Sequence, residues 1–168
     1  MSVAEDIASI VVQESKLTLP EFSAETAWQI GTLLRELAIA RGHSLVIDVR
    51  RFGSPHQVLF YSAVGTTEPD LARWIERKVN VVARFHKSSY LVGRLLEQSG
   101  LSFAERYGGL TLQDYATHGG GFPLHVAGAG IVGSVAVSGL PQREDHNLIV
   151  EALCLLTRRD HDALRLPS

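Results

Sequence analysis

The stretch His118–Gly139, HGGGFPLHVAGAGIVGSVAVSG, decides the fold, because its second half is open to two interpretations. The letters at 128–133, GAGIVG, match the G-x-G-x-x-G pattern of dinucleotide-binding folds. In those folds the third glycine opens a helix whose N–H groups face the pyrophosphate. Residues 134–138, SVAVS, instead have the β-branched composition of a strand. We therefore expect a β-hairpin here, in which glycine tolerates the positive φ angles of the turn.

A second pair of strands is expected upstream, at 44–52 and 56–64, where apolar and aromatic runs flank the tripeptide GSP. Helices are expected around each pair, from apolar residues at helical spacing and from capping signals such as Ser23 and Pro141. Paired strands between helices favour an α+β fold, with a central antiparallel sheet flanked by helices, over alternating βαβ units. The expected order is ααββααββα in a single domain, 1–168, with an additional capped helical turn at 102–105 and a short strand at 112–117.

The composition argues against several classes of protein. The 168 residues are 45% hydrophobic, enough for a continuous core, and the net charge of -2 gives no overall attraction to nucleic acid or anionic lipid. The N-terminal segment lacks the positive charge of a signal peptide, and no apolar run is long enough to span a bilayer. Cys154 is the only cysteine, which excludes an intramolecular disulfide. We expect a cytoplasmic protein without nucleic-acid or membrane partners.

The tetrapeptide HGGG at 118–121 is also the oxyanion-hole motif of lipases and esterases. That chemistry needs a nucleophile, and the sequence has no G-x-S-x-G elbow, since Ser138 lacks the preceding glycine. We therefore interpret the bend primarily as a turn leading into a strand, and an anion-binding loop is the alternative. The flanking histidines, His118 and His125, show no spacing typical of a zinc site, so no metal site is expected. Whether the two imidazoles face the same space stays open.

Basic residues gather between Arg73 and Arg94, where Glu76 is the only acid. A helix is expected up to a possible break at 86–89, HKSS. If it continues through Phe85, four of the basic residues fall on one stripe, because successive residues turn by about 100°: Arg73, Arg77, Arg84 and Lys87. Such a stripe could hold carboxylates or phosphates, although a solvated helix face has the same pattern. The segment 86–89, HKSS, is the part that we expect to be functional.

The pair Asp145-His146 falls in the first turn of the last expected helix. The carboxylate could orient the imidazole, or the acid could simply complement the helix dipole. No catalytic residue is assigned. The candidate ligand-binding residues are Arg84, His86, Lys87, Ser88, His118, Gly119, Gly120, Gly121, His125, Asp145 and His146.

Several segments in their order along the chain resemble the haem-degrading-domain superfamily of GlcG/HbpS-like proteins, in a bacterial and fungal branch of it. These segments are FHKSSY at 85–90, HGGGFPLHV at 118–126 and GIVGSVAVSGLPQREDHNLIVEAL at 130–153. The resemblance extends from about Ile7 to Leu156. It implies a profilin-like α+β fold that assembles into homo-oligomers, with haem or a related tetrapyrrole as a candidate ligand.

Three hypotheses of function follow. The first is a binding protein that holds haem or another small anionic ligand near His118 and His125, with carboxylates met by Lys87 or Arg84. The second is an enzyme that degrades haem at the same site with oxygen and a reductant. The third is an oligomeric scaffold that docks other proteins, with the glycine bend serving only the fold.

Overall fold

The structure is a computed structural model, and it describes residues 1–167. The predicted helices and hairpins are confirmed, within about two residues wherever ends were predicted. None of the helices in this range is long and apolar enough to cross a membrane. The elements in chain order are α1 (Val3–Lys16), β1 (Thr18–Leu19), α2 (Ala24–Ala40), β2 (Leu45–Arg51), β3 (Gln57–Val64), α3 (Asp70–Phe85), α4 (Ser89–Ser99), α5 (Phe103–Arg106), β4 (Gly121–Val126), β5 (Gly130–Ser138) and α6 (Gln142–Thr157).

The strands form one sheet in the order β1-β4-β5-β2-β3. The two predicted hairpins, β2–β3 and β4–β5, lie side by side because β5 pairs antiparallel with β2. The predicted central antiparallel sheet is therefore confirmed. The sequence did not predict β1, which pairs in parallel with β4 at one edge. With two residues before Pro20, β1 is too short to show an alternating pattern.

The glycine motif at 128–133 forms the hairpin turn and not a cofactor-binding loop. Gly128 and Gly130 have φ angles of +79° and +80°, in the region that favours glycine. The residues that follow Gly133 continue as β5, hydrogen-bonded to β4 and to β2. The helix that a pyrophosphate would require is replaced by a strand, as predicted.

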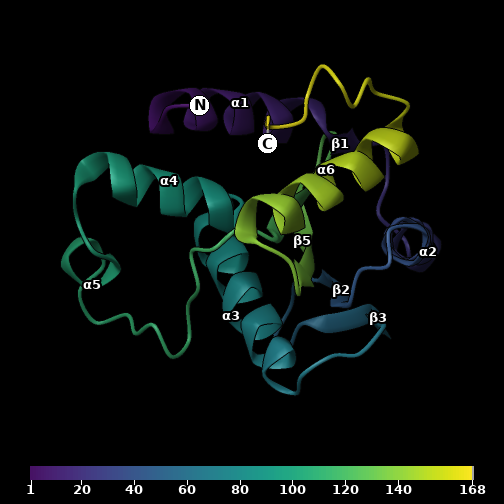
Figure 1. The fold of residues 1–168 in the computed structure, drawn as a ribbon, viewed down its shortest axis with the longest axis horizontal. Helices are drawn as coiled ribbons and strands as arrows, with labels where there is room; N and C mark the ends of the chain where they lie inside the picture. The colour runs from purple at the N-terminus through teal and green to yellow at the C-terminus, as the bar shows by residue number, and fades with distance from the viewer. Residues whose placement is uncertain (168) are drawn as a thin grey trace.

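Helices cover both faces of the sheet (Figure 1). One face packs on α2 and α6, and the largest apolar cluster lies between them, with Ile30, Ile47 and Leu153 fully buried. The opposite face packs on α3, where Ile75 and Val79 contact Ala136 of β5. Figure 1 shows α1 along one side of these layers, beside the C-terminal segment. Gln13 Nε2 of α1 donates to the Leu164 carbonyl of that segment at 2.6 Å.

Two predictions are wrong. Residues 112–117 contain a turn and no strand, and they follow the short capped helix α5. The basic stripe does not continue to Lys87, because α3 ends at Phe85 and His86 adopts a left-handed conformation with φ of +52°. Ser88 then caps α4, whose Leu91 N–H donates to the Ser88 hydroxyl. The chain therefore turns a corner where the stripe was expected to run on.

Candidate functional site

The glycine bend closes one side of a cavity of about 220 Å³ between α3, the end of β5 and the start of α6. We call it the bend cavity. A larger hollow of about 350 Å³ lies near β1, but its charged residues, Glu21, Arg158 and Arg159, are all exposed. The bend cavity is distinguished by a buried charged pair in its wall. Its polar and aromatic lining residues are Trp74, Lys78, His118, Ser138, Gln142 and Asp145.

The triple glycine is required because the bend packs tightly against its surroundings. Gly120 has a φ of +114°, and a Cβ there would overlap the Val137 carbonyl and lie 2.7 Å from Lys78 Nζ. Ser89 of α4 holds the bend from the other side. Its hydroxyl donates to the His118 carbonyl at 2.5 Å and accepts from the Gly121 N–H at 2.9 Å. The bend is therefore built into the fold by contacts on both of its sides.

Lys78 and Asp145 form a buried ion pair in the cavity wall, with Nζ 3.0 Å from Oδ2 and side-chain exposures of 3% and 2%. Lys78 Nζ also donates to the Val137 carbonyl at 2.8 Å, and Asp145 Oδ1 accepts from the Leu140 N–H at 3.0 Å. Burial raises the pKa of Asp145 to about 6, although Lys78 opposes that shift. Burial also lowers the pKa of Lys78, against the attraction of Asp145. The proton affinities of amine and carboxylate are thus brought closer together.

His118 stands exposed at the mouth of the cavity, edge-on to Trp74, with 5.1 Å between the ring centroids. Trp74 is held by Asp70, which accepts its indole N–H at 3.1 Å, and by the Arg77 guanidinium stacked 4.5 Å from the ring centroid. Partial burial lowers the pKa of His118, and the charges of Lys78 and Arg77 add to the shift. Within residues 1–167 the imidazole makes no hydrogen bond. A neutral ring with a free lone pair is therefore available to a ligand.

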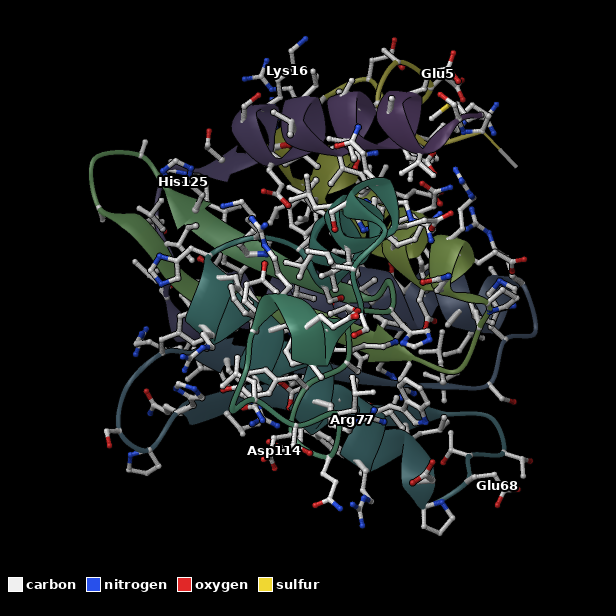
Figure 2. All side chains as sticks on the ribbon, turned by 90° about the vertical axis from the view of Figure 1, so that its left-hand side faces the viewer. Glu5, Lys16, Glu68, Arg77, Asp114 and His125 are labelled. Carbon is white, nitrogen blue, oxygen red and sulfur yellow. The ribbon has the colours of Figure 1, made fainter. Side chains whose placement is uncertain are left out.

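The structure brings five of the predicted residues together, at the bend and at Asp145. His125 is not among them. It pairs with Ile131 near the β4–β5 turn, four residues beyond Gly121, or about 13 Å at 3.3 Å per residue. Figure 2 shows His125 well away from Arg77, the residue that stacks on Trp74 beside His118. The two histidines that flank the bend motif thus lie toward opposite ends of β4.

The remaining predicted residues lie outside the bend cavity. Arg84, His86 and Lys87 are exposed at the corner between α3 and α4. The Ser88 N–H donates to Glu14 Oε1 at 2.7 Å, so Ser88 links this corner to α1. His146 faces the interior.

His146 does not contact the carboxylate of its neighbour Asp145. Its Nε2 lies 2.8 Å from Gln13 Oε1, and its ring packs against Tyr90 and Phe122. The side chain is fully buried, and burial together with the nearby Arg143 lowers its pKa to about 3. His146 is therefore a neutral core residue behind the cavity wall.

Sequence reasoning missed Lys78 and Trp74 as site residues. Lys78 lies within the basic segment 73–94 but outside its predicted stripe. A signal was present, because Lys78 lies three residues after Ile75 and four before Val82, on the apolar face of α3. A lysine at such a position must be buried, and a buried lysine requires a partner.

Comparisons with known proteins agree with this architecture. A UPF0303 protein of Acidobacterium capsulatum is 54% identical over 168 residues, which cover 100% of this chain and 99% of the relative. The crystal structure of the Ybr137w protein has a TM-score of 0.80 at 24% identity, covering 90% of this chain and 87% of that one. The PduOC:Heme complex has a TM-score of 0.67 at 15% identity, covering 79% of this chain and 93% of that one. At such identities the solved structures show a shared fold.

The family model described as "Haem degrading protein HbpS-like" matches residues 22–154. This range runs from the residue before the Ser23 cap to Cys154 in α6, so it includes the whole bend cavity. The resemblance expected from the sequence is therefore confirmed, and the chain belongs to the HbpS-like haem-degrading protein family.

Proposed function

We propose that this protein binds haem at the mouth of the bend cavity, with His118 as the ligand of the iron. The observation that carries the proposal is the exposed imidazole of His118, which is neutral and free of hydrogen bonds to the described residues. Neutral histidine is a common axial ligand of haem. Membership of the HbpS-like family and the likeness to a fold that holds haem in PduOC add support.

The residues present fit haem at its edge. The cavity of about 220 Å³ is smaller than the roughly 300–1,000 Å³ typical of pockets that enclose a drug-sized ligand. The cavity would admit only part of such a ligand, and Trp74 and Leu71 of α3 would provide apolar surface for it. Arg77 is the cation placed to meet a propionate there, because its guanidinium is stacked on Trp74 and has no ion pair among residues 1–167. This assignment replaces Lys87 and Arg84, which lie at the α3–α4 corner.

When bound, haem would supply the coordination and redox chemistry of its iron. The chain's own residues act by holding and orienting. Trp74 packs edge-on against His118, and partial burial together with the charges of Lys78 and Arg77 lowers the pKa of that imidazole, which favours its neutral form. The same site could hold a smaller anionic ligand through Arg77.

A haemin titration followed in the visible spectrum tests the proposal. Wild-type protein should give a saturable Soret shift, and His118→Ala should lose it. His125→Ala and His86→Ala are matched controls, because each removes a histidine outside the cavity and should leave the shift unchanged. If His118→Ala and wild type give the same spectrum and the same saturation point, His118 is not the ligand.

We propose in addition that copies of the chain associate through β3. This strand of eight residues is an edge of the sheet and pairs on one side only, with β2, within the described range. Val58 and Tyr61 on it are 49% and 52% exposed, and Trp28 of the neighbouring α2 is 58% exposed. A long edge with exposed apolar side chains is a typical site of strand pairing. Light scattering should show an oligomer for wild type and a monomer for Val58→Lys/Tyr61→Lys, whereas equal masses would exclude this edge.

A further inference from the structure

We propose that the bend cavity has a second activity, in which Lys78 captures a small uncharged aldehyde or ketone as an imine. The inference rests on the cavity itself and not on haem binding. It starts from the position of an amine in the cavity wall, 3.0 Å from a carboxylate that can exchange a proton with it.

The Lys78 amine is held by two hydrogen bonds and has a third donor without a partner among residues 1–167. Lys78 Nζ donates to the Val137 carbonyl at 2.8 Å and to Asp145 Oδ2 at 3.0 Å. An ammonium group has three donors, and the third has no acceptor among residues 1–167. Gly120 packs closely on one side of the amine, since a Cβ there would lie 2.7 Å from Nζ. Lys78 and Asp145 both line the cavity, so a compact ligand in it lies next to this pair.

The cavity has the size and lining for a compact carbonyl compound. Its volume of about 220 Å³ exceeds the ~150 Å³ of an apolar cavity known to take benzene. Leu71, Trp74 and Leu140 give it apolar surface, and Ser138 and Gln142 give polar groups. Lys78 is the only lysine or arginine among the described residues that line the cavity, and it is already paired with Asp145, which favours an uncharged substrate over an anionic one.

Asp145 supplies the proton transfers that imine formation needs. The carboxylate first takes a proton from the Lys78 ammonium, which leaves a neutral amine and a neutral acid. The nitrogen lone pair then forms a bond to the carbonyl carbon, and one N–H proton passes to the oxygen to give a carbinolamine. Asp145 returns its proton to that hydroxyl, the C–O bond breaks and water leaves. The product is a protonated imine paired with the Asp145 carboxylate, so atoms and charge balance without an oxidant or a reductant.

The physical requirement for such a lysine is that its amine loses a proton near neutral pH. Burial lowers the pKa of Lys78, and burial raises the pKa of Asp145 to about 6, so both shifts favour the proton transfer between them. Lys16 and Lys87, the other two lysines of the chain, are exposed. They are internal controls for the reactivity of ordinary lysines.

The test is reductive trapping with benzaldehyde and cyanoborohydride at pH 7, with the modified lysine identified by peptide mass mapping. Lys78 should be benzylated at least tenfold faster than Lys16 and Lys87. Asp145→Asn, which keeps the amine and removes the acid, should slow the labelling of Lys78 at least tenfold and leave the other two unchanged. Labelling of Lys78 at or below the rate of Lys87 would overturn the proposal, as would equal rates in wild type and Asp145→Asn.

Two further arms separate this inference from the haem proposal. His118→Ala should keep the rapid labelling of Lys78 even where haemin binding is lost. Wild type loaded with haemin should label more slowly at Lys78 alone, if haem lies across the mouth of the cavity. Rapid labelling of Lys78 in a protein that binds no haemin would support the imine site and exclude the haem site. Haemin binding with an unreactive Lys78 would support the haem site and exclude the imine site.

Discussion

Asp145 and His146 are neighbours in the first turn of α6, yet they belong to two different regions of the molecule. Asp145 points into the bend cavity and pairs with Lys78, whereas His146 points into the sealed core and meets Gln13. Burial shifts the two pKa values in opposite directions, to about 6 for Asp145 and to about 3 for His146. In both residues burial favours the neutral form, which is protonated for the acid and deprotonated for the imidazole. Adjacent residues of one helix therefore face two environments, a cavity wall with an exchangeable proton and a core that keeps its imidazole unprotonated.

The largest expected effect is on the pH dependence of stability. The pKa of His146 is lowered from 6.5, so its contribution to stability is fully present above pH 6.5 and is lost as the pH falls toward 3. The pKa of Asp145 is raised from 3.8, so its contribution is fully present below pH 3.8 and is lost as the pH rises through 6. As the pH falls from 6.5 to 4, the two contributions to the free energy of unfolding change in opposite directions. The contribution of His146 falls by roughly 3 kcal/mol and that of Asp145 rises by roughly 2 kcal/mol.

Single variants should separate these slopes. His146→Gln keeps a hydrogen-bonding group opposite Gln13. The free energy of unfolding of this variant, relative to that of wild type, should rise as the pH falls from 6.5 to 4. Asp145→Asn should have the opposite effect. Urea unfolding at a series of pH values measures both free energies. Curves parallel to wild type in both variants would show that neither residue titrates differently in the folded and unfolded states.

The sequence predicted this region only in part, and the reasons are geometric. Adjacent residues on an α-helix are about 100° apart around the axis, so Asp145 and His146 reach different surroundings although they were paired in the prediction. His118 and His125 were paired in the same way, and the extended backbone of β4 separates them. Proximity in sequence is a poor guide inside an element, because the element fixes where each side chain points.

The fold was more accessible to prediction than the site. The hairpins and helices can be predicted from the spacing of apolar residues and from capping residues such as Ser23 and Ser102, because both are local properties of the sequence. The β1–β4 pairing depends on a two-residue contact between distant segments, so no local pattern reports it. Lys78 likewise became a site residue only when the packing of α3 on the sheet brought its amine to Asp145 of α6. The triple glycine lies beside the bend cavity, and glycine is needed at Gly120 because a Cβ there would overlap the Val137 carbonyl.

A smaller effect is expected from the Lys78–Asp145 pair. Loss of one partner of a buried pair leaves the other uncompensated, but here each survivor can become neutral, which limits the cost. We expect Lys78→Met and Asp145→Asn each to lower the free energy of unfolding at pH 7 by about 1–3 kcal/mol. The double variant should cost less than the sum, with a coupling of about 1 kcal/mol or more. Strict additivity in urea unfolding would indicate that the two groups do not interact.

The smallest effect is expected at His118, at the mouth of the cavity. Its imidazole has no hydrogen bond to the described residues, and its main contact is the edge of Trp74. An exposed aromatic pair of this kind contributes about 0.5–1.5 kcal/mol at most, so His118→Ala should change the free energy of unfolding by about 0.5 kcal/mol. His125→Ala is the control for a histidine of similar sequence context. A loss of several kcal/mol in His118→Ala would make the ring structural, like His146, and would remove the reason for assigning it to a ligand, because a side chain held by the fold is no longer free to bind one.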